Sequence, residues 1–405
     1  MFHRRRMSAR GPLLPLLACT TLAWAAAPGL AQAPATQPLV LDAHADIPNP
    51  LDHPERTTTT IDAGTEVDID KLRAGGVGAI ILSIHAPKRA PTPQEHRIER
   101  EIADAKLKAI REIATRHPDK AAIALTAADV RGIAASGRVA IVLSVLNGSP
   151  YAQDADAVRA LHDQGVRVIG FVHAGNNELA DSSRPFARDV PGANGGLSPL
   201  GKQWVADANR HGVVLDVSQL TTQALLQTVA LSKTPVLATH SGVRALVDSP
   251  RNLTEEELKA VADTGGAVCV VAFSSYLINP TPDQQQQLQA VIARHGGLKN
   301  GYEGLSVAQR EALYADLAKL GFKATVDQYL DSVDHAVKAV GIDHVCLSTD
   351  FNHGSTGLIG WEDEGQTGNV TAALRKRGYS EADIGKLWSG NVLRVLEAAE
   401  AAAAR

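Results

Sequence analysis

Short apolar runs rich in β-branched residues recur along the chain, separated mostly by stretches with helical periodicity. The runs are continuous rather than alternating, which is typical of strands covered on both faces, as in a parallel sheet. Eight strands are predicted: Leu39–Ala43, Ala79–Ile84, Val139–Val145, Arg167–Val172, Val213–Val217, Val236–Thr239, Ala267–Phe273 and Val345–Thr349. Alternation of strand and helix repeated eight times predicts an α/β fold, a closed (β/α)8 TIM barrel.

The intervening helices have recognisable ends. One helix is predicted from Pro93 to His117, and another from Ser198-Pro199 to about His211. Thr254 and the following glutamates form a capping box that starts a third. The long segment at about residues 279–326, between the seventh and eighth strands, is predicted as a helical insertion at the barrel mouth.

The start of the chain predicts a signal peptide over residues 1–33. Its first ten residues hold four arginines, an apolar stretch follows, and Ala31-Gln32-Ala33 offers a cleavage site. We therefore expect a periplasmic or secreted protein with one mature domain over residues 34–405. Lipid anchoring at Cys19 is less favoured, because apolar sequence continues past it. No later segment has about 18 uninterrupted apolar residues, so none is predicted to span a bilayer.

The amino-acid composition argues against some classes of partner and substrate. The net charge is −4 and no basic cluster is present, which argues against a nucleic-acid partner. Aromatic residues make up 4% of the chain, which fits a small polar substrate better than a long polymer. Cys269 and Cys346 each lie in an apolar strand-like run. We expect them to be buried thiols rather than part of a disulfide framework.

Polar side chains follow five of the predicted strands. They are His44 with Asp46, His173, Ser218 with Gln219, His240, and Asp350. In a barrel these strand ends meet at one mouth, where catalytic groups of such folds lie. The sequence therefore predicts one shared site.

The donors at these strand ends suit a metal ion. His44 and Asp46 are two residues apart, so their side chains point the same way. An imidazole and a carboxylate suit zinc, with manganese or iron as alternatives. A single His-x-Asp motif is equally compatible with a histidine that bonds a neighbouring turn, but His240 and Asp350 at two further strand ends favour a metal. Asp350 is also predicted to take a proton from the attacking water as a general base.

Two further residues can act on the substrate. His173 can donate a hydrogen bond to a developing oxyanion, although a lone histidine is also a common core residue. Arg251 can hold a substrate carboxylate with two bonds, or it can brace its own loop through backbone carbonyls. The sequence leaves both alternatives open.

Several motifs occur in series: Leu41–Asp46, Ala174–Ser182, Thr239–Ser241 with Arg251–Thr254, Ser348–Phe351 and Gly390–Val395. From about Leu39 to Leu396 the chain resembles the membrane dipeptidase family, peptidase family M19 of the amidohydrolase superfamily. The resemblance implies a barrel of the metal-dependent hydrolase type that cleaves the amide bond of a dipeptide or small acyl-amino acid with metal-activated water. It also implies that Arg251 and Asn177 orient the substrate, and it suggests a homodimer.

The chain departs from the family at two metal-binding positions. In the family a glutamate after the third strand bridges two zinc ions, and the second zinc takes a histidine from each of the fifth and sixth strands. Leu146 stands in the place of the glutamate, and Gln219 in that of the fifth-strand histidine. Two cations would then repel with less compensation. We expect one tightly held ion, at His44, Asp46 and Asp350.

Two other functions remain open at this stage. The barrel can be a repurposed single-metal or metal-free enzyme in secondary metabolism or envelope maturation, or a non-catalytic protein that binds a small ligand. Fold alone does not choose among them. Metal content and turnover of dipeptides do.

Overall fold

The computed structural model describes residue 1 and residues 38–52, 65–297, 305–352 and 357–403. The predicted signal peptide, its cleavage site and Cys19 lie outside the described residues. The chain divides into Met1–Gln37 and Pro38–Arg405, and the second unit carries the fold.

Eight parallel strands form the centre of this unit. Their order in the sheet follows the chain: β1 (Val40–Asp46), β2 (Val77–Ile84), β4 (Val139–Val145), β5 (Val166–Gly170), β6 (Val214–Asp216), β7 (Leu237–Val243), β9 (Ala267–Val271) and β10 (Val345–Ser348). The path nearly closes on itself, because the backbone N–H of Asp350 donates to the carbonyl of His44 and that of Asp46 to the carbonyl of Phe351. The predicted (β/α)8 TIM barrel is therefore confirmed.

All eight predicted strands are present; the bounds of β4 are as predicted, and the others differ by up to four residues at an end. Two short strands lie outside the eight-strand path and were not predicted: β3 (Ala121–Ile123), which pairs with β4, and β8 (Asn252–Leu253), which pairs with β7. Both are too short to give a hydrophobic pattern of their own.

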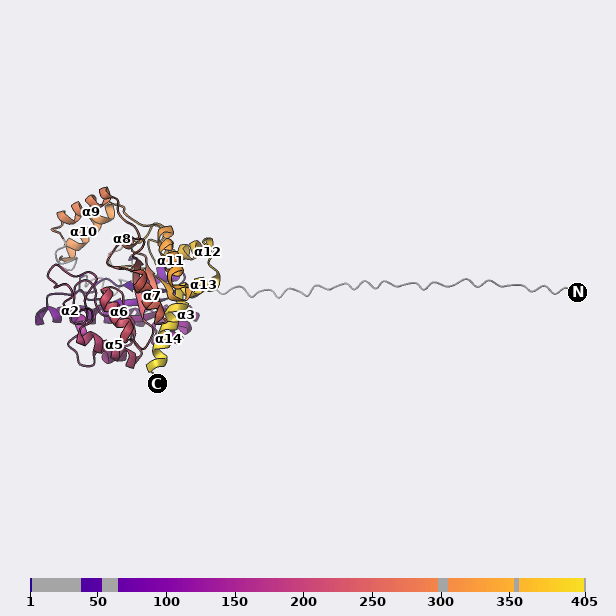
Figure 1. Ribbon diagram of the computed structural model, residues 1–405, viewed down its shortest axis with the longest axis horizontal. Coiled ribbons are helices and arrows are strands. Elements are labelled where there is room, and N and C mark those ends of the chain that lie inside the picture. Colours follow the sequence, from indigo (N-terminus) through magenta and orange to yellow (C-terminus); the bar gives the residue numbers. More distant parts are fainter. Residues whose placement is uncertain (2–37, 53–64, 298–304, 353–356, 404–405) are drawn as a thin grey trace. The chain divides into compact units, whose positions relative to one another are not determined.

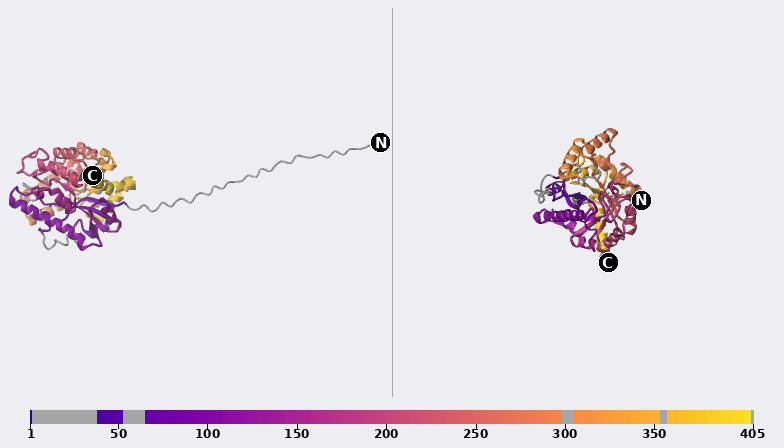
Figure 2. Two further views of the ribbon diagram at one scale, coloured as in Figure 1. Left: turned by 90° about the horizontal axis from the view of Figure 1, so that it is seen from below. Right: turned by 90° about the vertical axis from the view of Figure 1, so that its left-hand side faces the viewer.

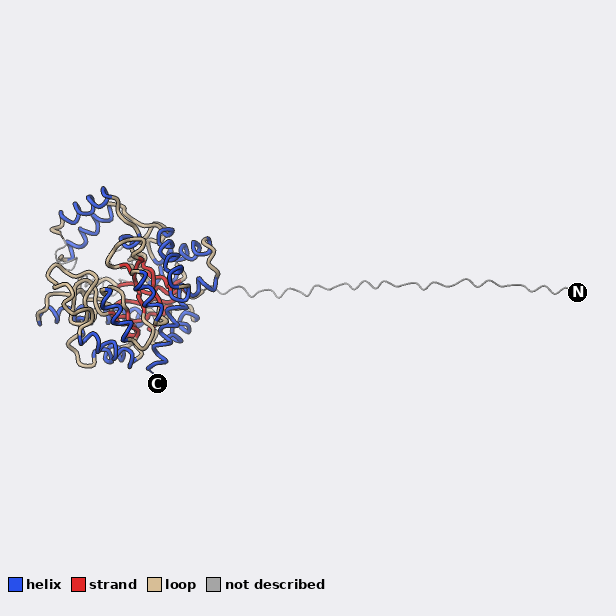
Figure 3. The backbone as a smooth tube through the Cα atoms, viewed as in Figure 1, coloured by secondary structure: helices blue, strands red, loops and turns tan. Residues whose placement is uncertain are grey.

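Helices surround the strands (Figure 1 and Figure 3). They are α1 (Ile69–Ala74), α2 (Pro93–Arg116), α3 (Ala127–Ala135), α4 (Ala157–Asp163), α5 (Pro199–His211), α6 (Thr222–Leu231), α7 (Glu255–Asp263), α8 (Ser274–Leu277), α9 (Pro282–Arg294), α10 (Val307–Lys319), α11 (Val326–Val340), α12 (Thr367–Lys376), α13 (Glu381–Gly385) and α14 (Asn391–Ala403). Thr254 and Glu257 form the predicted capping box at the start of α7. No described helix is long and apolar enough to cross a membrane.

Apolar side chains fill both the barrel interior and the layer between strands and helices. The interior cluster includes Leu41, Ile81, Val142 and Val168, all at most 1% exposed. Burial on both faces explains the continuous apolar runs in the sequence. Each fully buried side chain of this size contributes roughly 1.5–3 kcal/mol, which provides the stability that holds the strand ends in place.

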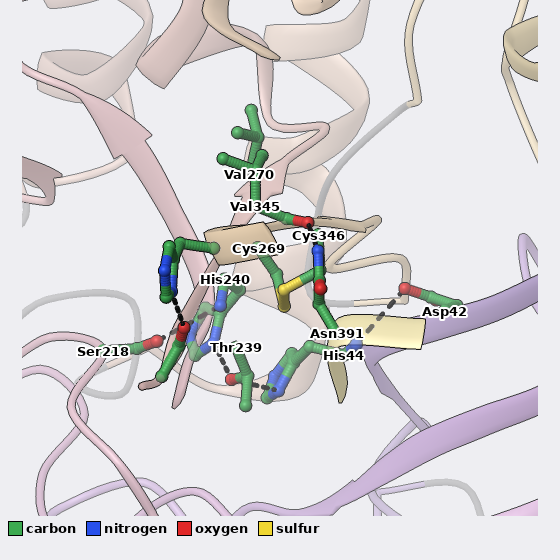
Figure 4. Close-up of a disulfide and its surroundings, with 12 residues drawn as sticks. Asp42, His44, Ser218, Thr239, His240, Cys269, Val270, Val345, Cys346 and Asn391 are labelled. Atoms are coloured by element: carbon green, nitrogen blue, oxygen red, sulfur yellow. Dashed lines mark hydrogen bonds between the residues drawn. A yellow bond between two sulfur atoms is a disulfide. The ribbon is translucent and has the colours of Figure 1, made fainter. Parts of the chain in front are cut away.

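A disulfide joins Cys269 of β9 to Cys346 of β10 (Figure 4). The expectation of two buried thiols was therefore wrong. The two residues are register partners on adjacent parallel strands, and their Cα atoms lie 4.0 Å apart. A separation of 77 residues hides this pairing from the sequence, because only the strand register brings the cysteines together.

The segment at 279–326 contains α9 and α10. The two helices contact each other and lie together at one end of the described barrel, coloured orange in Figure 1 and in the right-hand view of Figure 2. No described residue of either helix belongs to the core clusters of the barrel. The pair is therefore an addition to the barrel rather than part of its core.

Candidate metal centre

Three of the expected metal-type donors converge at the barrel mouth. The ligand atoms of His44, His240 and Asp350 all lie within 4.8 Å of one another, and all three residues are buried. Nε2 of His44 lies 3.7 Å from Oδ1 of Asp350. The His44 and His240 rings are stacked, with centroids 3.9 Å apart. β1, β7 and β10 thus bring together side chains that are distant in the sequence.

Asp46, the fourth expected donor, lies outside this group of three. Its Oδ1 is 3.7 Å from Nζ of Lys106, a buried lysine of α2. Burial lowers the pKa of Lys106, and the nearby Asp46 carboxylate opposes that shift. The amino group of Lys106 is thus held beside the Asp46 carboxylate.

A shared hydroxyl sets the protonation of both ring systems. Thr239 Oγ1 donates its single proton to Oδ2 of Asp216, at 2.5 Å. It can therefore only accept from Nδ1 of His240, at 2.8 Å, and from Nδ1 of His44, at 3.4 Å. Both histidines then keep their proton on Nδ1 and carry a lone pair on Nε2, the arrangement that a metal-ligating histidine needs. Figure 4 shows Thr239 close to the two rings.

Gln219 occupies the lone pair of His240. Its Oε1 accepts a hydrogen bond from Nη2 of Arg184 at 2.9 Å, which fixes the orientation of the amide. Its Nε2 then faces Nε2 of His240 at 3.0 Å and donates to it. Gln219 and Asp350 also have positive φ angles of 68° and 57°, a backbone conformation uncommon for residues other than glycine that concentrates at functional sites.

His173 lies next to the same arginine. Nη2 of Arg184 is 2.9 Å from Nε2 of His173, and a guanidinium can only donate. Nε2 of His173 is therefore an acceptor, and the ring proton resides on Nδ1. A neutral imidazole with one N–H is able to donate a hydrogen bond, which is the property predicted for it.

Arg251 is 2% exposed, and its guanidinium is only partly used. Nη2 donates to the carbonyl of His240 at 2.7 Å, whereas Nε and Nη1 have no hydrogen-bond partner among the described residues. The guanidinium carbon lies 5.2 Å from the centre of the Tyr276 ring. Arg251 was predicted either to brace its loop or to bind a substrate carboxylate. One nitrogen of its guanidinium braces the backbone, and the other two have no partner among the described residues.

Asn177 braces its own loop. Its Nδ2 donates to Oδ1 of Asn147 and to the carbonyl of Phe171, and its Oδ1 accepts from the backbone of Leu179 and Ala180. All four hydrogen-bonding positions of the amide are used within the protein. We therefore do not propose Asn177 as a substrate-binding residue.

Leu146, which the resemblance places at the position of the bridging glutamate, offers no metal ligand. Leu146 is 2% exposed and apolar. The carbonyl oxygen of the neighbouring Asn147 side chain accepts from Asn177 at 2.9 Å and from the backbone of Ser149 at 3.2 Å. Neither residue supplies an oxygen to a second ion.

Two buried acidic residues, Asp42 and Glu364, lie near the strand ends that carry the site. Asp42 accepts hydrogen bonds from the hydroxyl and backbone of Thr349 and from the backbone of His44. Burial raises the pKa of Asp42, and burial together with Asp42 raises that of Glu364 well above its ordinary range. The hydrogen bonds of Asp42 to Thr349 and His44 join the β1 and β10 strand ends that carry His44 and Asp350.

The donor set of His44, His240 and Asp350 fits a metal ion. His44 Nε2 is buried without a hydrogen-bond partner and faces Asp350, and the His240 lone pair lies beside it once the Gln219 amide gives way. Two imidazoles and a carboxylate suit zinc. Leu146 and Gln219, which the family resemblance places at the positions of two zinc ligands, provide no anionic or imidazole ligand.

The sequence interpretation missed Lys106 and Arg184. Lys106 occupies the buried face of α2 with Ile102, Ala103 and Ile110, and a lysine at such spacing was a usable signal. Arg184 lies in the irregular segment after β5, and its contacts with Gln219 and His173 give no sequence pattern.

One cavity of about 990 Å³ opens onto this site. Asp46, His173, Gln219, Arg251 and Asp350 line it. Groups that can bind a substrate, orient it and transfer protons therefore line one open cavity.

A parallel (β/α)8 barrel with histidine and aspartate at its strand ends defines the class of metal-dependent hydrolases. The model of the membrane dipeptidase family, peptidase family M19, matches residues 31–405. The chain belongs to this family.

Individual relatives agree with this assignment. The chain is 36% identical to the probable dipeptidase PvdM from Pseudomonas aeruginosa, a solved structure with a TM-score of 0.82, and the match covers 90% of this chain and 96% of that one. It is 27% identical to dipeptidase tcpJ of Claviceps purpurea, over 86% of this chain and 73% of the relative. It is 26% identical to dipeptidase ataJ of Aspergillus terreus, over 84% and 78%. These matches support a hydrolase of the metallo-dipeptidase type.

Proposed function

We propose that this protein is an exported hydrolase that cleaves the amide bond of a dipeptide or small acyl-amino acid at a single divalent ion. The observation that carries the proposal is the convergence of His44, His240 and Asp350 within 4.8 Å, beside a cavity lined by Arg251. Hydrolysis consumes one water, breaks the amide C–N bond and yields a carboxylic acid and an amine.

His44, His240 and Asp350 would hold the ion, with zinc favoured and manganese or iron as alternatives. An ion bound there supplies Lewis-acid chemistry that polarises the amide carbonyl and makes water a stronger nucleophile. Asp46 lies two residues after His44 and adds negative charge, which Lys106 partly balances.

Three residues of the chain act on the substrate in this proposal. Asp350 accepts the proton of the attacking water and later returns one to the leaving amine. The Nδ1–H of His173 donates to the oxygen that becomes negative in the transition state. The free Nε and Nη1 groups of Arg251 bind the substrate carboxylate and fix the position of the amide.

Export is supported by the Cys269–Cys346 disulfide, because disulfides persist mainly in oxidising compartments outside the cytosol. Export also agrees with the predicted signal peptide over residues 1–33. N-terminal sequencing of the protein from a periplasmic or culture fraction tests this part, with Pro34 expected as the first residue. An intact start in a cytosolic fraction would contradict it.

Elemental analysis and a dipeptide panel test the activity. Protein purified without chelators should contain about one zinc, manganese or iron per chain and should hydrolyse at least one of a panel of L,L and L,D dipeptides. Asp350→Asn should lower kcat by about a hundredfold or more. Asp248→Asn, at an exposed position of the loop after β7, is the matched control and should retain activity. Bound metal without turnover of any compound would favour a binding protein.

A further inference from the structure

The cavity above the metal centre is larger than a free dipeptide requires. Its volume of about 990 Å³ is at the upper end of the roughly 300–1,000 Å³ typical of pockets for drug-sized ligands. A dipeptide of two small residues would leave much of this space to water, so the size of the cavity indicates a larger ligand.

The helices α9 and α10 give the cavity an apolar wall. Leu288 and Ile292 of α9 are four residues apart, and Val307, Tyr314 and Leu317 of α10 follow helical spacing, so each set shares one face of its helix. All five line the cavity and are only half-buried. The wall therefore presents partly exposed apolar side chains to the cavity.

This wall continues toward the arginine of the site. Phe273 and Tyr276, at the start of α8, also line the cavity and are stacked with ring centroids 4.7 Å apart. The Tyr276 ring lies beneath the guanidinium of Arg251. One ligand can thus place a carboxylate at Arg251 and an apolar group along the aromatic pair and the two helices.

Two of the carboxylates that line the cavity already have cationic partners. Asp46 pairs with Lys106, and Asp52 pairs with Arg310 of α10. A free substrate ammonium would have to compete with these cations for its partner. An acylated amino group carries no charge and avoids that competition.

We propose that the substrate carries a bulky apolar acyl group on its amino side, so that the cavity takes N-acylated amino acids or dipeptides in preference to free dipeptides. The inference rests on the proposed hydrolysis at the metal centre. α9 and α10 are then the elements that select the acyl group.

Calorimetric binding tests the inference separately from hydrolysis. The probes are the acetyl, octanoyl and dodecanoyl derivatives of L-alanine, used below their micelle concentrations, and the Kd should fall by at least about tenfold from octanoyl to dodecanoyl, since each buried methylene favours binding. The value of kcat/KM for the same acyl series on a dipeptide should rise in parallel. Affinity that does not change with chain length, with free dipeptides cleaved as well as the dodecanoyl form, would overturn the inference and leave the proposed hydrolysis intact. Chain-length-dependent affinity without any turnover would retain the acyl site and reject the hydrolysis.

Substitutions in the apolar wall locate the effect. Leu288→Ser with Leu317→Ser should reduce the ratio of dodecanoyl to acetyl affinity by about tenfold. Leu231→Ser, at an exposed apolar position of α6 outside the cavity, is the matched control and should keep the wild-type ratio. If the double variant does not fold by circular dichroism, Leu317→Trp, which fills the cavity instead of opening it, should reduce the same ratio. An unchanged ratio in a folded wall variant would count against the proposal.

Discussion

The side-chain amide of Gln219 lies 3.0 Å from Nε2 of His240 and donates to the lone pair that a metal-ligating histidine needs. Arg184 fixes this orientation by donating to the amide oxygen. The site thus holds a hydrogen-bond chain from the Arg184 guanidinium through the neutral Gln219 amide to His240. Leu146, which the resemblance places at the bridging glutamate, likewise carries no negative charge that could lie between two cations.

Restoring the two missing ligands should restore the second metal position. In Leu146→Glu with Gln219→His, a carboxylate and an imidazole return to the strand ends beside His240. Two close cations then have a shared anion between them, so zinc content should rise from about one ion per chain toward two. Elemental analysis after dialysis against metal-free buffer measures this stoichiometry.

A neutral double substitution is the control. Leu146→Gln with Gln219→Asn introduces polar groups of similar size but neither a charge nor an imidazole, so its zinc content should stay at the wild-type value. If the Glu and His variant also keeps the wild-type stoichiometry while remaining folded, Leu146 and Gln219 do not stand at the second metal position.

Arg251→Lys should weaken recognition of a terminal carboxylate. Lysine keeps the positive charge but cannot present Nε and Nη1 together, so the two-bond contact is lost. KM for a substrate with a free carboxylate should rise about tenfold to a hundredfold, whereas a carboxamide-capped substrate should change little. Steady-state kinetics with both substrates gives the comparison. Arg244→Lys, in the same loop but outside the substrate cavity, should leave both KM values near wild type. An equal change for both substrates would show that Arg251 only braces its loop.

Glu66 should make the stability of the metal-free protein depend on pH. Burial raises its pKa from 4.5 to about 7, although its carboxylate accepts a hydrogen bond from the backbone of Asn352 at 2.7 Å. Between these values the folded protein binds more protons than the unfolded chain. The contribution of protonated Glu66 to the free energy of unfolding is therefore fully present below pH 4.5 and is lost as the pH rises to about 7.

Glu66→Gln isolates this contribution. Glutamine is similar in size and does not titrate, so the variant should be about as stable as wild type at pH 5 and more stable by on the order of 2 kcal/mol at pH 8. Urea denaturation in the presence of a chelator gives both free energies of unfolding. A difference between the two proteins that does not change with pH would mean that Glu66 titrates normally.

The barrel was predictable because its strands are buried on both faces. The run Val139–Val145 is apolar at every position except Ser144, and its predicted bounds equal those of β4. The positions of the donors were predictable for a related reason. His44 and Asp350 are polar residues that each directly follow a predicted strand, where the apolar run ends. Both features are local in the sequence.

Contacts between distant segments were not predictable. Lys106 reaches Asp46 from a different element, and Arg184 reaches Gln219 and His173 from an irregular segment. Neither contact leaves a periodic pattern, because each depends on how the barrel closes. The same is true of the hydrogen bonds that Asn177 makes within its own loop.

The Cys269–Cys346 disulfide gives the last prediction, because it replaces the two buried thiols expected from the sequence. It closes a loop of 77 residues between neighbouring strands of the barrel interior, so it should stabilise the fold chiefly by restricting the unfolded chain. Cys269→Ala with Cys346→Ala should lower the free energy of unfolding by about 2–4 kcal/mol, measured by urea denaturation. Thiol titration of the denatured, unreduced mature protein should find no free cysteine, and two after reduction. Two free thiols before reduction would restore the original expectation and remove the structural support for export.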